Sequence, residues 1–485
     1  MSGSRVDLAA AARRIVLERG FEAEPGPDVA REVAALRAPD LSQPGEGVRD
    51  LRQLLWSSID NEDSRDLYQI EYAETLEDGA TRLVIGIADV DSLVPRGSAT
   101  DAHAGANTTS LYTGVAIFPM LPNELSAGLT SLLPDQDRRA IVTEVVVEQD
   151  GTVVRYDAYR AIVRNKAKLV YEDVGAWLEG GAMSKTIGSV DGLVPQLRLQ
   201  RDAAKRLKTE RLNAGALELD TIEARPTMKD GNVMDLAVVR KNLARDLIED
   251  FMIAANIAIA KFLEKSGSSG IRRVVREPER WERIVDLARE RGTALPAQPD
   301  SLALAAFLAK ERAKDELRFP DLSLAIVKLL GRGQYALDLP GKDPGIHFGL
   351  AVHDYSHSTA PNRRYADLIE QRLVKAVLDK KPQPYSNNEL TDIAAHCTER
   401  EDSAQKVERQ MRKVIAAQLL SDRIGQRFDA IVTGVNKDGT YARLLHPPAE
   451  GKVVKGAQGM DVGDRVALKL VRADPLRGFI DFARA

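Results

Sequence analysis

The chain has 485 residues, a formal net charge of −4, 44% hydrophobic and 29% charged residues, a composition typical of soluble globular proteins with more than one domain. A single cysteine, Cys397, excludes an internal disulfide framework and a cysteine-rich zinc module. The sequence starts without an apolar signal core, and no apolar run reaches the roughly 20 residues of a membrane span. We therefore expect a cytoplasmic protein that makes no membrane contact.

Residues 1–50 are expected to form a small helical N-terminal domain. An alanine-rich stretch ends at Gly20, and Asp28 is placed to cap a second helix over residues 29–36. Two short helices and a turn leave two interpretations open: a helix-turn-helix that binds nucleic acid, or a unit that only packs against the rest of the chain.

Residues 51–420 are predicted to begin with strands and to continue with helices. Apolar, β-branched runs flank Asp150-Gly151, a strong signal for a β-hairpin. Helical periodicity follows at about 190–213, 239–265, 363–380 and 387–419. Strands followed by helices, without alternation, indicate an α+β fold and not a doubly wound sheet.

Residues 424–485 change character and alternate apolar with polar positions. Turn signals at 436–439 and 463–464 separate several short strand-like runs. This pattern predicts a small all-β barrel at the end of the chain.

Four acidic side chains fall within seven positions: Asp60, Glu62, Asp63 and Asp66. Carboxylates this close repel one another, and a divalent cation removes that cost. Ligation by oxygen alone suits Mg²⁺, which binds one or two carboxylates together with substrate phosphates. The alternative is a solvated acidic turn.

A basic segment lies some 300 residues downstream, where Arg363 and Arg364 follow Pro361. Both arginines are expected in the first turn of a helix, where cations oppose the helix dipole, so helix stability does not explain them. The planar guanidinium matches phosphate oxygens. The alternative is an ion pair between Arg364 and Asp367 on an exposed face, with Arg363 solvated.

The order and spacing of these segments resemble the ribonuclease II/ribonuclease R family in its catalytic RNB domain. The resemblance rests on residues 59–66, 87–90, 112 with 118–126, 248–256 and 359–367. It implies a hydrolytic, processive, Mg²⁺-dependent exoribonuclease that works from the 3′ end of RNA and releases 5′-monophosphates. It also implies that the C-terminal barrel is an OB-fold RNA-binding domain.

The expected partners are single-stranded RNA and RNA with a 3′-tailed duplex, with no obligate protein partner. Typical members carry two cold-shock barrels before the catalytic block, where this sequence has only the helical residues 1–50. We therefore expect a short form whose channel entrance is less shielded from duplex RNA.

The family motif has four aspartates, and Asp60 and Asp66 fall on the first two. The resemblance implies that both are catalytic and bind metal. The third position holds Tyr68, a poor magnesium ligand, and the fourth holds Gln69, whose carbonyl oxygen is a weaker ligand. Three hypotheses remain open: an active exoribonuclease, a catalytically weakened RNA-binding member of the family, and a metal-dependent enzyme that degrades DNA.

The resemblance also assigns residues to the substrate. Arg363 falls on the catalytic arginine that steadies charge on the cleaved phosphate, and Arg364 is the adjacent basic position. Tyr112 falls on the aromatic residue that sets the RNA end in the active site. Glu249 falls in the block whose acidic residue contacts ribose, although an ordinary solvated glutamate is the alternative.

Two further candidates are set aside. His353 and His357 stand four residues apart, but no third ligand lies nearby in the sequence, so zinc is not expected. Cys397 is expected to be a buried small residue and not a nucleophile.

Overall fold

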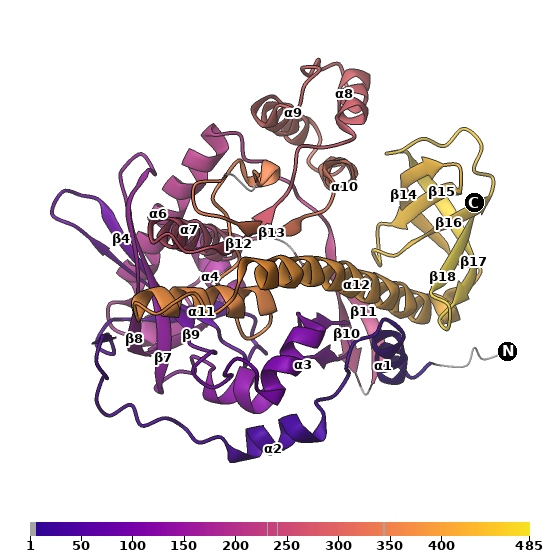
Figure 1. The fold of residues 1–485 in the computed structure, drawn as a ribbon. Helices are drawn as coiled ribbons and strands as arrows, with labels where there is room; N and C mark the ends of the chain where they lie inside the picture. Colours follow the sequence, from indigo (N-terminus) through magenta and orange to yellow (C-terminus); the bar gives the residue numbers. More distant parts are fainter. Residues whose placement is uncertain (1–5, 230, 240, 343–344) are drawn as a thin grey trace.

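The computed structural model describes residues 6–229, 231–239, 241–342 and 345–485. It has an α+β catalytic part and a C-terminal closed barrel, as the sequence predicts, and one long helix runs between them (Figure 1). No helix among the described residues is long and apolar enough to cross a membrane.

The main sheet has seven strands in the order β1-β8-β7-β4-β3-β2-β9. Their bounds are β1 Val48–Asp50, β2 Ser57–Asp60, β3 Gln69–Thr75, β4 Thr81–Ala88, β7 Asp137–Val147, β8 Val153–Arg164 and β9 Ala167–Val170. Neighbouring strands are antiparallel except β1 with β8 and β2 with β9. Strand β1 lies inside residues 1–50, so the sheet begins slightly earlier in the chain than the predicted boundary.

The predicted hairpin at Asp150-Gly151 is confirmed, because β7 and β8 pair as antiparallel neighbours on either side of it. Gly151 has a φ of +96°, a conformation that favours glycine. A Cβ at this position would also lie 2.3 Å from the carbonyl oxygen of Arg206. The turn therefore needs glycine both for its backbone conformation and for close packing against a helix.

Most of the remaining elements are helices. Their bounds are α1 Leu8–Glu18, α2 Pro27–Ala35, α3 Ala99–Asn107, α4 Tyr171–Leu178, α5 Lys185–Ser189, α6 Leu193–Asn213, α7 Leu243–Lys265, α8 Trp281–Glu290, α9 Ser301–Lys314, α10 Phe319–Leu330, α11 Tyr365–Leu378 and α12 Asn387–Leu420. The four long helical segments predicted from periodicity correspond to α6, α7, α11 and α12. Short helical turns are η1 Glu124–Leu129, η2 Phe348–Leu350 and η3 Ser421–Arg423.

Apolar side chains cover both faces of the main sheet. One face, with Ile59 and Ile85, packs against α6 and α7 through Leu197 and Phe251. The other face packs against the segment that contains η1 and against α11. A sheet that is buried on both faces has no solvent side, so a polar residue on either face of its central strands is enclosed.

Helix α12 has 34 residues and is therefore about 51 Å long. A capping box fixes its first turn, because Ser386 and Glu389 satisfy each other's backbone N–H groups. The second half of α12 shares one apolar core with α1 and with the barrel, through residues such as Ile15, Met411 and Phe482. Figure 1 shows α1 and the barrel at the same end of this helix.

The two N-terminal helices contact different parts of the molecule. Helix α1 is capped by Asp7 and packs on α12, whereas α2 packs near α3, where Glu32 accepts backbone N–H bonds from Ala99 and Thr100. The predicted capping role of Asp28 is wrong, since Gly26 is the N-cap of α2 and Asp28 lies in the first turn.

The barrel closes in the order β14-β15-β16-β18-β17. Its strands are β14 Arg427–Asn436, β15 Gly439–Leu444, β16 Glu450–Lys455, β17 Arg465–Asp474 and β18 Phe479–Arg484. Smaller two-stranded sheets are β5 Leu111–Tyr112 with β6 Ile117–Phe118, β10 Glu223–Lys229 with β11 Asn232–Val239, and β12 Gly270–Val274 with β13 Gln334–Asp338.

Candidate active site

The acidic turn follows strand β2, which ends at Asp60. The Oδ1 atom of Asp60 accepts hydrogen bonds from the Asn61 backbone N–H and from the Ser64 hydroxyl, both at 2.7 Å, and the residue is 8% exposed. Burial raises the pKa of Asp66, the nearby Asp60 carboxylate acts in the same direction, and Arg363 opposes it. Asp60 and Asp66 are therefore the enclosed carboxylates of the turn, whereas Glu62 and Asp63 are exposed to solvent.

Tyr68 and Arg363 contact each other directly. Nη2 of Arg363 donates a hydrogen bond to the Tyr68 hydroxyl at 3.1 Å, and its guanidinium carbon lies 4.9 Å from the centre of the Tyr68 ring. Tyr68 therefore points toward the arginine and not into the core. The position where the resemblance implies a carboxylate is occupied by a neutral hydroxyl.

Gln69 is 1% exposed, and its Nε2 atom donates to the Ile59 carbonyl at 3.3 Å. That bond leaves the amide oxygen, Oε1, buried and without a hydrogen-bond donor. A buried acceptor without a partner is costly, and a cation would relieve that cost. This atom is the part of Gln69 that is suited to bind a metal ion.

The described residues contain no group of three or more His, Cys, Asp or Glu side chains arranged to hold a metal ion. Two carboxylates, Asp60 and Asp66, and the orphaned oxygen of Gln69 remain. This donor set fits a single Mg²⁺, which prefers a few protein oxygens and leaves its other positions to water and phosphate. It does not supply the carboxylates that a pair of metal ions needs.

Tyr112 ends strand β5 beside the same group. Burial of its hydroxyl raises the pKa of Tyr112, and Arg363, Asp66 and Tyr68 lie within electrostatic reach of it. Tyr112 as a whole is nevertheless 40% exposed. An exposed ring beside the arginine is suited to stack on a terminal base.

The backbone holds the Tyr112 and Arg363 segments together. Ser110 N–H donates to the Arg363 carbonyl at 3.0 Å, and Tyr365 N–H donates to the Thr108 carbonyl at 2.8 Å. The fold thus brings together the acidic turn, the Tyr112 segment and the Arg363 loop, which the sequence separates by up to about 300 residues.

Arg364 has a different environment. It is the N-cap of α11 with an extended backbone, so both arginines precede this helix, and the prediction that they lie in its first turn is wrong. Its Nη2 donates to Asp367 at 2.7 Å, but Asp367 is fully buried and not on an exposed face. Asp367 also accepts from the Ala360 N–H, so this pair holds the loop that carries Arg363.

A cavity of about 250 Å³ lies beside Arg363 and Arg364, between the loop and α12. Its wall includes Tyr335, whose hydroxyl is 2.9 Å from Nδ1 of His357. Burial lowers the pKa of His357 and raises the pKa of Cys397 to about 12, so both side chains are neutral near pH 7. Cys397 is buried, as the sequence predicts.

Glu249 lies on α7 with its side chain 48% exposed, and it forms an ion pair with Lys241 at 2.8 Å. The same helix sends a different residue to the acidic turn: Nη2 of Arg245 donates to Oδ1 of Asn61 at 3.2 Å. Arg225 donates to the same oxygen at 3.1 Å. The sequence analysis did not assign Arg245 to the site. In the sequence, Arg245 is marked only as a basic residue close to the family block at 248–256.

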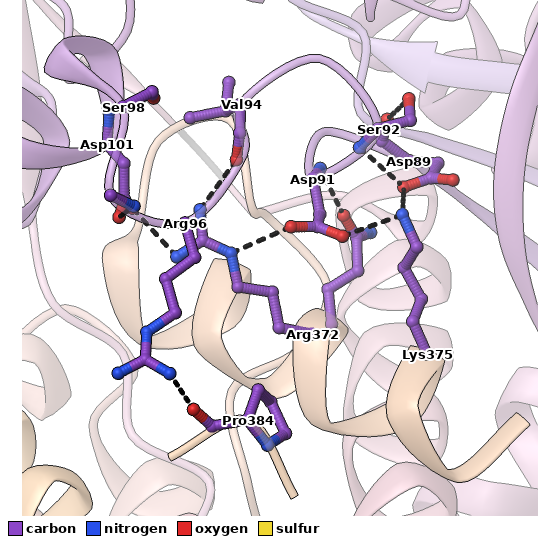
Figure 2. Close-up of polar contacts among 12 residues, drawn as sticks. Asp89, Asp91, Ser92, Val94, Arg96, Ser98, Asp101, Arg372, Lys375 and Pro384 are labelled. Carbon is purple, nitrogen blue, oxygen red and sulfur yellow. Dashed lines mark hydrogen bonds and ion pairs between the residues drawn. The ribbon is translucent and has the colours of Figure 1, made fainter. Parts of the chain in front are cut away.

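A network of ion pairs positions α11, whose N-terminus follows Arg363 (Figure 2). Nζ of Lys375 lies 2.8 Å from carboxylate oxygens of both Asp89 and Asp91. Arg372 pairs with Asp91 and Asp101, each at 2.8 Å. Asp89 belongs to the family block at 87–90, and its contact with Lys375 indicates that this block positions the helix.

Comparison with known proteins extends these observations. A family model described as the RNB domain matches residues 48–380, and one described as the RNase II-type exonuclease C-terminal S1 domain matches residues 426–485. Ribonuclease R of Thermotoga maritima is 30% identical over 493 aligned positions, which cover 95% of this chain and 68% of that protein. Ribonuclease R of Escherichia coli is 30% identical over 432 positions, which cover 86% of this chain but 52% of that protein.

Solved structures share the fold at lower identity. Mycoplasma genitalium RNase R, solved with ribose-methylated single-stranded RNA, is similar with a TM-score of 0.89 and 24% identity, over 99% of this chain and 78% of that chain. Yeast Ssd1, described as a pseudonuclease, has a TM-score of 0.70 and 16% identity, over 95% of this chain and 57% of that chain.

Proposed function

Because the chain belongs to the RNB family of ribonuclease II-type exoribonucleases, we propose that it degrades single-stranded RNA hydrolytically and processively from the 3′ end and releases 5′-monophosphates. The observation that supports this proposal best is the position of Arg363, which lies within electrostatic reach of Asp66 and donates a hydrogen bond to Tyr68. Cleavage of a phosphodiester requires a cationic group where charge develops and anionic groups that hold a metal ion.

In this proposal Asp60, Asp66 and Oε1 of Gln69 hold Mg²⁺. A magnesium ion bound there supplies positive charge against the scissile phosphate and favours ionisation of the attacking water. Arg363 donates N–H bonds to the phosphate oxygens on which charge accumulates. Tyr112 stacks against the terminal base and sets the phosphate beside the arginine.

A second candidate function is RNA binding with slow cleavage. It is favoured by the hydrogen bond between Arg363 and Tyr68, which occupies one donor of the arginine and replaces a carboxylate with a neutral group. The fold does not decide between the two functions, since relatives of this architecture include both ribonuclease R and a protein described as a pseudonuclease.

The test is incubation of the purified chain with 3′- or 5′-labelled single-stranded RNA and DNA, with and without Mg²⁺. We expect Mg²⁺-dependent release of nucleoside monophosphates from RNA, starting at the 3′ end. Binding of RNA without shortening at any Mg²⁺ or Mn²⁺ concentration supports the second candidate. Equal degradation of DNA contradicts the preference for RNA.

A further inference from the structure

Two arginines from different elements converge on one oxygen atom of the acidic turn. Nη1 of Arg225, on β10, and Nη2 of Arg245, on α7, donate to Oδ1 of Asn61 at 3.1 and 3.2 Å. These two nitrogen atoms are therefore no farther apart than the sum of the two distances, about 6.3 Å. The backbone N–H of Asn61 donates to Oδ1 of Asp60 at 2.7 Å, so Asn61 connects the two arginines with the proposed metal ligand.

Asn61 does not account for two positive charges at this place. Its amide oxygen is neutral, whereas two guanidinium groups this close repel each other. Arg245 also pairs with Glu172 at 2.9 Å, but the Glu172 side chain is 63% exposed, and pairs at such exposed positions contribute little. A phosphate group is negatively charged and presents several acceptor oxygens, so it would offset the repulsion between Arg225 and Arg245.

Helix stability does not explain Arg245 either. Asn242 is the N-cap of α7 and accepts a hydrogen bond from the backbone N–H of Arg245, so Arg245 lies in the first turn of this helix. A cation in the first turn opposes the helix dipole. The guanidinium carbon of Arg245 lies 4.4 Å from the centre of the Tyr171 ring, a contact that holds the group in place. The side chain is therefore fixed at the acidic turn, although its charge does not favour the helix that carries it.

Both arginines keep hydrogen-bond donors for a further acceptor. The side-chain bonds of Arg245 to Asn61 and Glu172 both use Nη2. Within the described part of the chain Nη1 of Arg245 makes no hydrogen bond, and it does not belong to the buried unpartnered atoms, whereas Nε does. The two N–H groups of Nη1 are consequently accessible to a ligand. Arg225 is an exposed residue, so a ligand can reach it from solvent.

We propose that Arg225 and Arg245 form a second phosphate subsite, which binds the RNA phosphate next to the scissile one on its 5′ side. This inference rests on the proposed function, in which Arg363 and a metal ion at Asp60 bind the scissile phosphate. A terminal nucleotide with a 3′-hydroxyl has no phosphate beyond the scissile one, so the neighbouring phosphate lies on the 5′ side. The bond between Asn61 and Asp60 puts the two arginines beside the metal site, where a neighbouring phosphate of the same strand would lie.

The test maps phosphate contacts with uncharged substitutions in the RNA. A single methylphosphonate, which lacks the negative charge, replaces each phosphate in turn in a short fluorescent RNA with a 3′-hydroxyl end. Affinities are measured in chelator, so that no metal-dependent cleavage occurs. The proteins are the wild type, the double variant Arg225→Gln with Arg245→Gln, and the control Arg198→Gln. Arg198 is a matched control because it also lies over an aromatic ring of α4, that of Trp177.

In the wild type and in Arg198→Gln, we expect a methylphosphonate at the second phosphate from the 3′ end to weaken binding about tenfold, a typical effect of losing a hydrogen bond to a charged group. In the double variant the same methylphosphonate should have almost no effect, whereas substitutions at the other phosphates should act as they do in the wild type. An unchanged profile in the double variant overturns the proposal and shows that the two arginines only hold the acidic turn. A wild type that tolerates the methylphosphonate at the second phosphate also overturns it.

The single variant Arg225→Gln keeps the test decisive if the double variant does not fold, because Arg225 is an exposed residue. We expect Arg225→Gln to lose part of the effect at the second phosphate, and an undiminished effect there overturns the proposal. Since these measurements are made without metal and without cleavage, a chain that shows the expected profile but does not cut RNA contradicts only the nuclease function.

Discussion

The Arg363 guanidinium donates a hydrogen bond to the Tyr68 hydroxyl at 3.1 Å and lies over its ring, although the two residues are 295 positions apart. This contact sets an aromatic residue against the arginine, two positions after Asp66 of the acidic turn. The positive charge of an arginine that binds a hydroxyl is not compensated by its partner, so it remains available to a phosphate. A carboxylate partner would compensate that charge. Because Tyr68 stands where the family motif has an aspartate, the proposed metal site has one carboxylate fewer than that motif supplies.

Tyr68→Asp should increase turnover of RNA by about tenfold or more at saturating Mg²⁺, because the cation gains a carboxylate ligand. RNA affinity should change less, since phosphate contacts supply most of it. Tyr68→Phe is the matched control, because it removes the hydroxyl and adds no ligand. Turnover and melting temperature of the three proteins are compared, and a lower melting temperature without faster cleavage would contradict the metal-ligand explanation.

Arg363→Ala should lower turnover by roughly 10²–10³ and leave RNA affinity almost unchanged, because this residue acts where charge develops. Single-turnover kinetics and equilibrium binding separate the two effects. If affinity and turnover fall together, Arg363 is a binding residue and our assignment is wrong.

Arg364→Ala should act mainly on stability, because it leaves the fully buried Asp367 without its ion-pair partner. Breaking a buried pair typically costs about 3–5 kcal/mol, and Arg364 is partly exposed, so the lower end of that range is expected. Denaturant unfolding measures this loss. Arg364→Ala with Asp367→Asn should recover part of it, and a double variant as unstable as the single one would contradict the pairing.

The barrel carries a row of exposed basic residues across its strands. Arg427 is opposite Lys469, and both Lys469 and Lys455 neighbour Ala483 on β18. Replacing the three basic residues with glutamine should weaken RNA binding and reduce the slope of log affinity against log salt by about 2, with turnover at saturation unchanged. Lys437→Gln, in the turn between β14 and β15, is the control, and an unchanged salt slope in the triple variant would contradict binding at this row.

Burial raises the pKa of Glu370 to about 8, far above the value of about 4.3 in an unfolded chain. The folded state therefore holds a proton that the unfolded state releases. This stabilising effect is complete below about pH 4 and is lost as the pH rises toward 8. Glu370→Gln should flatten the pH dependence of unfolding between these values, whereas the exposed Glu399→Gln should not; parallel curves for the wild type and Glu370→Gln would contradict the raised pKa.

Sequence patterns predicted the regular elements well, because periodicity reports directly which faces are apolar. Helices α6, α7, α11 and α12, the β7–β8 hairpin and the barrel all lie where these patterns place them. The motif residues Asp60, Asp66, Tyr112 and Arg363 also come together in one place.

The environments of individual polar residues were less predictable. Glu71 alternates with the apolar Ile70 and Tyr72, a pattern that normally places a glutamate in solvent. It is buried because helices cover both faces of this sheet, which local sequence does not report. Arg245, and not Glu249, reaches the acidic turn because the packing of α7 decides which of its faces is turned toward that site.

The apolar core that α1, α12 and the barrel share has a consequence for cooperativity. The first helix of the chain and its last strands bury their apolar side chains against the same half of α12. Loss of either one exposes the surface that the other needs, so the two ends of the polypeptide form one unfolding unit although the whole catalytic part separates them in sequence. Helix α12 extends from that unit to the cavity beside Arg363, so a substitution that loosens the shared core is expected to lower the stability of the helix that forms one wall of that cavity.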